Sequence, residues 1–479
     1  MLDQADANEL LNPLFGECIS SPLVRELLRL LSDDLIERGY VTTRPYLAVQ
    51  DISDGDIDVR VLVGRIEAIV DAQSEESSIR LDSAFAFTGP VLNLRELETA
   101  LEAIERPRSV QANFEIRPGS GQGDSIVAVE TVDASPLAIE IGANARTDAD
   151  PQASFGATLD NPLKLNDILE FRYNDNDTFQ AYQSERSREW YYSLGFSRYL
   201  LSYSYRDLTY RQRLQGIGGS FVAKGDSESH RLELGRLMAR GQAWRLDASL
   251  NLELEDSSNF FDGEEIDVSS YRTSKAGLEL NHQWYASWGL LYSRYAYQQG
   301  LDSFGARDDS FFSEIDADSS AARLQFSKHV VETRLNYYLP RPGWQAGFNF
   351  HGQYSDDLLF DADKLFLGSE NTVRGYTSAL SGANGWYTRV EAIRRFQSAG
   401  DLDGTLFKTV SLAFGLDYGD IRCEADNPDL CGDIYGFGAG VTITDDNFNA
   451  LLSWGHPLKE RDDGIGDEDV FLLDLRFGF

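Results

Sequence analysis

The sequence predicts two small α+β units followed by an all-β barrel that crosses a membrane with about sixteen antiparallel strands. Three observations support this fold class. The last ten residues form an amphipathic strand, the pattern changes near Pro136 from mixed helices and strands to nearly continuous strands, and those strands alternate apolar and polar residues. A membrane barrel accounts for all three, because its strands need one face for lipid and one for the lumen.

The final strand, residues 470–479, carries the clearest pattern. One face of this period-two strand holds Phe471, Leu473, Leu475, Phe477 and Phe479. The opposite face holds Leu472, Asp474, Arg476 and Gly478. A soluble edge strand with this many outward apolar groups would aggregate, whereas a strand in lipid requires them. The ending resembles the terminal strand of bacterial outer-membrane proteins.

Composition narrows the class of protein. The chain has 479 residues, of which 42% are hydrophobic, and no apolar run is long enough for a membrane-spanning helix. An aromatic content of 12% is high for a chain of net charge −35 and suits the aromatic girdles of a barrel. The same acidity argues against a nucleic-acid partner. On composition alone, an acidic secreted β protein remains the alternative.

The chain has three cysteines, so a single disulfide would leave one of them unpaired. Cys423 and Cys431 bracket an acidic loop and are a possible disulfide in an oxidising compartment. Cys18 lies near a predicted helix end, where a small buried apolar role is expected. No second pair of ligands indicates zinc, so we predict no metal.

Residues 1–63 are predicted to form the first α+β unit. A helix near residues 7–17 precedes a longer one that starts at Ser21-Pro22, with a capping hydroxyl and an early proline, and ends at Gly39. Strands are expected near residues 40–49 and 57–63. The second unit, residues 64–133, repeats the order. It has a strand at 66–70, a short helix within 79–87, a helix that begins with a capping box of Asn93 and Glu96, and strands at 110–116 and 125–132.

The order of strand, two helices and two strands resembles the polypeptide-transport-associated (POTRA) domain. Residues 39–69, GYVTTRPYLAVQDISDGDIDVRVLVGRIEAI, and residues 89–97, GPVLNLREL, resemble the POTRA region of two-partner secretion transporters. The resemblance implies that both units are periplasmic. The first unit lacks the leading strand of the pattern, and residues 1–4 lack the basic, apolar lead-in of a signal peptide, so a truncated chain is expected.

Residues 134–479 are predicted to form the barrel. Trp344, Ala346, Phe348 and Phe350 alternate with polar or small residues, as a lipid-facing strand requires, although a soluble barrel with an apolar core would show the same alternation. Counting back from Phe479, short turns at 444–447 and 397–404 fall at one end. Long acidic loops at 356–382, 423–433 and 460–469 fall at the other, which is expected to be extracellular.

The loop 356–382 contains Val373, Arg374, Gly375 and Tyr376. This run resembles the VRG(F/Y) tip of the sixth extracellular loop in two-partner secretion transporters and related barrel insertases. The resemblance implies that the loop folds into the lumen and that its arginine pairs with an aspartate on the wall. Asp417 and Gly419 match the wall position. A guanidinium and a carboxylate at such a site can form two parallel hydrogen bonds.

Two further features surround the expected pair. Arg389 and Glu391 also match the family pattern and are expected to extend an ionic network in the lumen. Gly436, Gly438 and Gly440 share one face of the next strand and, with Gly415 and Gly419, would form a smooth inner wall that the loop backbone approaches closely. Strand curvature is an equally good explanation of these glycines.

Signals for catalysis are weak. The five histidines are scattered, no motif surrounds a serine or cysteine nucleophile, and the glycines at 436–440 precede no helix as a phosphate loop would. We therefore predict no catalytic residue and no cofactor. Acidic clusters around residues 308–318 lack the ordered spacing of a calcium loop and are predicted to be solvated.

The resemblance covers essentially the whole chain and implies an outer-membrane translocator. It would export an unfolded, large adhesin-like or haemolysin-like partner that bears an amino-terminal secretion domain, through a monomeric barrel in outer-membrane lipid and without ATP. The alternatives are a barrel-assembly insertase of the same superfamily or, from other classes, a passive porin or a barrel enzyme such as a lipase.

Overall fold

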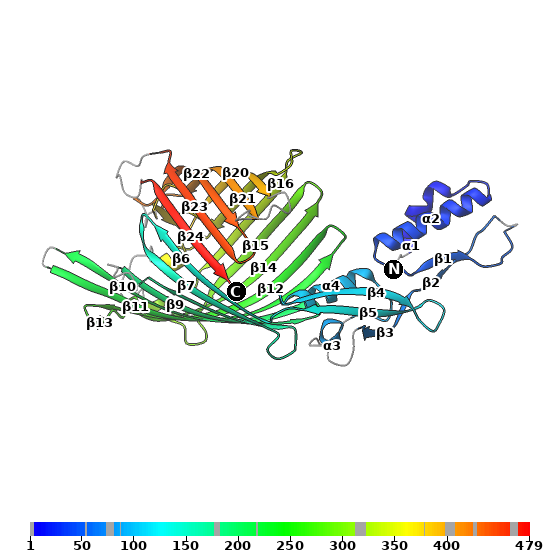
Figure 1. The fold of residues 1–479 in the computed structure, drawn as a ribbon, viewed down its shortest axis with the longest axis horizontal. Coiled ribbons are helices and arrows are strands. Elements are labelled where there is room, and N and C mark those ends of the chain that lie inside the picture. The colour runs from blue at the N-terminus through cyan, green and yellow to red at the C-terminus, as the bar shows by residue number, and fades with distance from the viewer. Residues whose placement is uncertain are drawn as a thin grey trace.

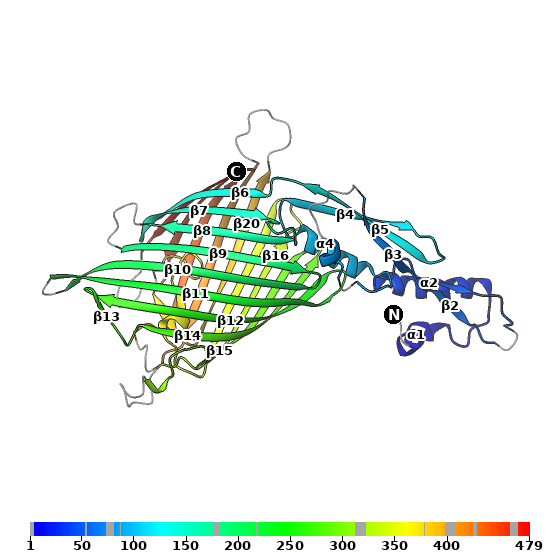
Figure 2. The ribbon, with the colours of Figure 1, turned by 90° about the horizontal axis from the view of Figure 1, so that it is seen from below.

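A computed structural model describes residues 4–52, 55–72, 81–86, 88–176, 183–216, 219–311, 322–377, 379–397, 408–424, 429–459 and 468–479. It contains two α/β units and a barrel, and both units lie beyond one end of the barrel (Figures 1 and 2). Among the described residues, no helix is both long and apolar enough to cross a membrane.

The first unit packs two helices beside a two-stranded sheet. It comprises α1 (Gln4–Leu11), a 3₁₀ turn (Asn12–Leu14), α2 (Ser21–Glu37), β1 (Arg44–Leu47) and β2 (Val59–Leu62), with β1 and β2 antiparallel. The capping residue of α2 is Ser20 rather than Ser21, because the Ser20 side chain accepts the bond from Leu23 N at 3.4 Å. Cys18 is exposed, so the expected buried role is wrong.

The second unit has its own apolar core. It comprises β3 (Arg65–Asp71), α3 (Leu81–Ala84), α4 (Leu94–Glu105), β4 (Val110–Pro118) and β5 (Asp124–Asp133), with strand order β3-β5-β4. Asn93 caps α4 by accepting from Arg95 N at 2.8 Å. Glu96 does not complete the predicted capping box, since its carboxylate accepts from Gly89 N at 3.1 Å and Arg198 Nη2 at 2.9 Å.

Sixteen strands close the antiparallel barrel, as predicted, and the two-residue β13 (Glu264–Glu265) pairs at the end of β12. Each strand pairs with its sequence neighbours, and β24 pairs with β6 to close the ring. The strands are β6 (Leu137–Arg146), β7 (Ala149–Asp160), β8 (Asp167–Asp175), β9 (Gln183–Phe196), β10 (Tyr199–Gly216), β11 (Gly219–Arg240), β12 (Trp244–Phe261), β14 (Tyr271–Ala286), β15 (Gly289–Leu301), β16 (Ser327–Tyr338), β17 (Trp344–Tyr354), β20 (Gly385–Gln397), β21 (Thr409–Ile421), β22 (Gly432–Thr444), β23 (Phe448–Pro457) and β24 (Val470–Gly478).

The faces of the strands follow the predicted alternation. On β24, Phe471, Leu473 and Phe477 are exposed, and on β21 the exposed side chains are Phe414 and Leu416. Asp417, the next residue after Leu416, is buried on the inner face. A continuous apolar outer surface with charged groups inside is the arrangement that a barrel in lipid requires.

Strand direction places the carboxyl end beside the α/β units. Phe479 exchanges backbone hydrogen bonds with Ile139, and its end of β24 lies near α4 and β4 (Figure 1). The three-residue turn 445–447 is at this end, whereas the long connection between β17 and β20 is at the other. The predicted turn 397–404 and loop 460–469 lie largely outside the described residues.

The second unit contacts the barrel rim through charged side chains of α4. Glu96 bonds to Arg198, and Glu102 bonds to Arg240 at 2.9 Å and to Arg245 at 3.2 Å. Arg106, at the end of α4, donates to Ser193 Oγ at 2.6 Å. These contacts hold the second unit against the rim strands β9 to β12.

Candidate functional site

The connection between β17 and β20 folds back against the inner face of the barrel as a small hairpin. Its strands are β18 (Leu365–Leu367) and β19 (Leu380–Gly382), which pair antiparallel. We call residues 363–383, of which 378 is not described, the loop hairpin. Val373 and Tyr376 at its tip are fully buried and pack with Ile421 and Ile434 at the ends of β21 and β22. The motif therefore lies against the wall rather than in solvent.

The structure brings Arg374 and Asp417 together. Arg374 Nε donates to Asp417 Oδ2 at 2.7 Å, and Nη2 donates to Oδ1 at 2.7 Å. The backbone N of Arg374 also donates to Oδ2 at 3.1 Å. Both side chains are buried. This fork of parallel bonds fixes the orientation of the tip as well as neutralising the two charges.

Arg389 and Glu391, on the neighbouring strand β20, complete the cluster. Glu391 Oε1 accepts from Arg374 Nη1 at 2.9 Å, and Arg389 Nε lies 3.4 Å from Asp417 Oδ1. Arg389 also donates to the backbone oxygen of Glu370 at 2.7 Å. The guanidinium groups of Arg374 and Arg389 thus face the carboxylates of Asp417 and Glu391, with the Glu370 carboxyl group nearby, so each buried charge has an opposite charge beside it, as burial of ions requires.

Glycines allow the tip to approach the wall. A Cβ at Gly436 would overlap the Arg374 carbonyl oxygen, and one at Gly438 would overlap its guanidinium. Gly415 and Gly419 are similarly close to Arg374 and to Leu367 or Val373, respectively. At Gly440 the closest atom, 3.5 Å away, belongs to Leu452 on the next strand, so this glycine is not part of the contact.

One contact residue was missed by sequence reasoning. A Cβ at Gly455, on β23, would lie 2.7 Å from Gly375 N and 2.9 Å from Arg374 Cβ. The sequence around Gly455 indicates a strand but no contact with the loop. Its pairing register, Gly438 opposite Gly455, would have revealed that a second glycine faces the same point.

Tyr376 and Gly375 attach the tip to β22 and β23 at the strand ends remote from the α/β units. The Tyr376 hydroxyl lies 2.7 Å from the backbone oxygens of Tyr435 and Lys459 and accepts from Lys459 N at 3.2 Å. Gly375 has φ +85° and lies against the His456–Pro457 peptide, where a side chain would not fit. The left-handed conformation and the close approach both require glycine here.

A disulfide joins Cys423 and Cys431, between β21 and β22. The loop that it closes touches the loop hairpin, since Ser381 N donates to Leu430 O at 2.9 Å. Cys431 also packs against the buried cluster that contains Val373 and Tyr376. The disulfide thus constrains the wall at the point where the loop hairpin rests on it.

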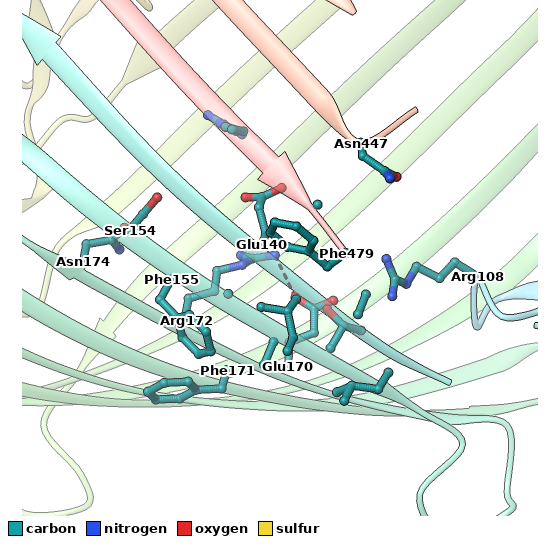
Figure 3. A pocket seen from close by; sticks show the side chains of 18 of the residues that line it. Arg108, Glu140, Ser154, Phe155, Glu170, Phe171, Arg172, Asn174, Asn447 and Phe479 are labelled. Atoms are coloured by element: carbon teal, nitrogen blue, oxygen red, sulfur yellow. Dashed lines mark hydrogen bonds and ion pairs between the residues drawn. The ribbon is translucent and has the colours of Figure 1, made fainter. Parts of the chain in front are cut away.

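Space remains in the barrel near the end that carries the α/β units. A cavity of about 1000 Å³ lies beside the junction of β24 and β6, and residues 373–376 do not line it. Its lining includes Arg108, Glu140 and Phe479, and the ion pair between Glu170 and Arg172 at 2.7 Å (Figure 3). The tip of the loop hairpin, residues 373–376, therefore lies away from this cavity.

Within the part of the chain that the structure describes, no group of three or more His, Cys, Asp or Glu side chains is arranged to hold a metal ion. Two histidines lie on the outer face and bond to tyrosines, His230 to Tyr203 and His329 to Tyr295, each at 2.8 Å. The acidic cluster at 308–318 lies partly outside the described residues.

A closed sixteen-strand barrel, α/β units at its periplasmic end and a hairpin held inside by a buried ionic cluster define an outer-membrane transporter. Residues 123–443 match the family described as haemolysin secretion/activation protein ShlB/FhaC/HecB, and the chain belongs to it. Residues 1–64 match the POTRA domain of ShlB type and residues 65–118 a further POTRA domain. The predicted resemblance, and with it the outer-membrane location, is confirmed.

Individual relatives agree with this assignment. The chain is 26% identical over 464 residues to the outer membrane transporter CdiB of Dickeya dadantii, covering 96% of this chain and 81% of the relative. It is 28% identical over 441 residues to the hemolysin transporter protein ShlB of Serratia marcescens, covering 89% and 74%. The structure of CdiB from Escherichia coli superposes with a TM-score of 0.90 at 25% identity, covering 100% of this chain and 88% of that one.

Proposed function

We propose that this protein exports an unfolded exoprotein from the periplasm to the cell surface through the barrel lumen, and that the loop hairpin is the gate. The observation that carries the proposal is the buried fork between Arg374 and Asp417, which holds the loop hairpin against the inner wall. An interaction that ties a lumen segment to the wall is a means of controlling passage, since the segment must leave before a polypeptide enters.

We propose domain limits that separate the units that receive the partner from the barrel that exports it. Residues 1–63 and 64–133 form two POTRA units that receive the amino-terminal secretion domain of the partner, and residues 134–479 form the barrel with its inserted loop 356–382. Among the described strands, the sheet of the second unit has edges at β4 and at β3, and β3 bridges to Val91 at its first residue. Such edges pair with extended peptides through main-chain hydrogen bonds, which suits an unfolded client.

We further propose that the barrel acts as a monomer in outer-membrane lipid and performs no catalysis. The ionic groups of the site pair with one another, and the residues at 373–376 include no serine or cysteine nucleophile. Opening would rely on differential binding of the exoprotein to the open state.

Co-expression with a candidate exoprotein from a neighbouring open reading frame, followed by measurement of its release at the surface, tests the proposal. Arg374→Ala is expected to change release strongly while the barrel still inserts in the membrane, because the loop hairpin is no longer held at the wall. Glu279→Gln, which alters a wall ion pair with Arg231 and Arg294, is the matched control. Normal release by Arg374→Ala would refute the gate. Rescue of barrel assembly in an insertase-depleted strain, without release, would support the insertase alternative instead.

A further inference from the structure

A second buried ionic cluster holds the loop hairpin at the end remote from Arg374. Asp363 Oδ1 accepts from Lys275 Nζ of β14 at 3.1 Å and from Lys328 Nζ of β16 at 3.0 Å. Lys328 Nζ also donates to the backbone oxygen of Asp363 at 3.1 Å. Lys275 and Asp363 are buried, with relative exposures of 6% and 7%. None of the three residues belongs to the motif or to its wall strands β20 to β23.

Gln353, on β17, joins both ends of the loop hairpin. Its Nε2 donates to the backbone oxygen of Asp363 at 3.0 Å and to that of Ala383 at 3.2 Å. These carbonyls belong to the residues at which the loop hairpin begins and ends. The buried side-chain amide of Gln353 therefore links the two segments at the base of the loop hairpin to each other and to β17.

We propose that Lys275, Lys328, Asp363 and Gln353, the base cluster, form a fixed hinge about which the loop hairpin swings when Arg374 leaves Asp417. This inference rests on the proposed gating function. It assigns positioning roles to four residues outside the motif. The loop hairpin would move as a unit, because β18 and β19 remain paired between the hinge and the tip.

The two ends differ in how easily they can leave the wall. Around Arg374 the wall is largely glycine, at positions 415, 436, 438 and 455, so the tip can withdraw without rearranging wall side chains. At the base, Asp363 is the carboxylate that bonds to both ammonium groups, and Glu253 and Glu255 lie close enough to act on Lys275 electrostatically. Departure of Asp363 would remove the ion pair of both lysines, which is unfavourable in a buried site.

The base is also packed against apolar side chains that lie around it. Phe326, Leu359 and Ala383 form a buried cluster, and Lys328 Nζ lies 5.4 Å from the centre of the Phe326 ring. Phe360 contacts the ring of Tyr271 with 5.9 Å between ring centroids. Side chains of β14, β16 and β17 therefore enclose the base, whereas the tip rests on wall glycines and packs its own apolar side chains against the ends of β21 and β22.

Amide hydrogen exchange of the full chain in lipid nanodiscs tests the hinge without any exported partner. In Arg374→Ala, exchange should rise about tenfold or more at residues 369–377 and change less than about twofold at 363–367 and 380–383. In Asp363→Asn, exchange should rise about tenfold or more at 363–367 and 380–383. Glu279→Gln should leave both regions as in the parent protein.

An equal rise in amide exchange at the base and at the tip in Arg374→Ala would overturn the hinge. Unchanged exchange at the base in Asp363→Asn would also overturn it. If Asp363→Asn does not fold, Gln353→Met removes the bridging amide without a charge. It should raise exchange at the base but not at the tip, and no change there would overturn the proposal. Because exchange is measured without export, failure of the hinge and failure of the transport function remain separate results.

Discussion

Arg374 binds Asp417 through its backbone N–H, at 3.1 Å, as well as through Nε and Nη2 of its guanidinium, each at 2.7 Å. The carboxylate thus fixes the main chain of the tip together with the side chain. A lysine can supply the charge at this position but neither the fork nor its geometry. The specificity of the contact therefore depends on the guanidinium.

Arg374→Lys should weaken closure of the loop hairpin by about 1–3 kcal/mol, because at least one charge-assisted hydrogen bond is lost. Arg374→Ala should weaken it further, since Asp417 and Glu391 would then share only Arg389. Single-channel recording in planar bilayers measures the effect as an increase in open probability, larger for alanine than for lysine. Wild-type gating by the lysine variant would contradict the role of the fork.

Gly438→Leu should displace the tip, because its side chain would occupy the position of the Arg374 guanidinium. Gly440→Leu is the matched control, two residues away on the same face but with Leu452 rather than the tip as its nearest neighbour. Only the first variant should show protease-sensitive loops and impaired export. If both glycines behave alike, strand curvature rather than close approach explains them.

Removal of the disulfide by Cys423→Ser with Cys431→Ser should lower the free energy of unfolding by about 2–3 kcal/mol, from the entropy of the short loop that it closes. The hydrogen bond from Ser381 to Leu430 should then exchange faster, because its acceptor lies in that loop. Thermal denaturation and amide exchange measure the two effects. Replacing the exposed Cys18 by serine should change neither.

Arg240→Glu should loosen the second α/β unit from the rim, since the new carboxylate would face Glu98 and Glu102. Combining it with Glu102→Arg should restore much of the contact. Each exposed pair contributes only about 0.2–1 kcal/mol, so the effect should be small at high salt and clear at low salt. Distances between spin labels on α4 and the rim report it. A contact insensitive to both charge and salt would contradict this prediction.

The barrel and the tip contact were predictable because they depend on local patterns. Period-two alternation located the strands and their faces, and the run from Val373 to Tyr376 identified the tip. The inner face of β21 then offered Asp417 as the buried carboxylate. The strand pattern placed Asp417 on one face of its strand, and the resemblance of the loop motif to that of the transporter family implied its pairing with Arg374.

Contacts that depend on distant register were not predictable in the same way. Gly455 reaches the tip only because β23 pairs with β22 in one register. Lys275, Lys328 and Asp363 are far apart in the sequence and meet only in the folded barrel. Glu96 fitted a local capping pattern, but a long-range contact with Arg198 prevailed, as tertiary interactions often override local preferences.

The pairing of β6 with β24 determines when the barrel can close during assembly. The first barrel strand finds its last neighbour only when the final residues of the chain have arrived, so the ring cannot be completed while any later strand is missing. Until then, both strands present unpaired edges that are prone to aggregation. The α/β units, whose contacts are local, can fold earlier. Loss of the last few residues should therefore act as an assembly defect, even though all of the gating residues are present.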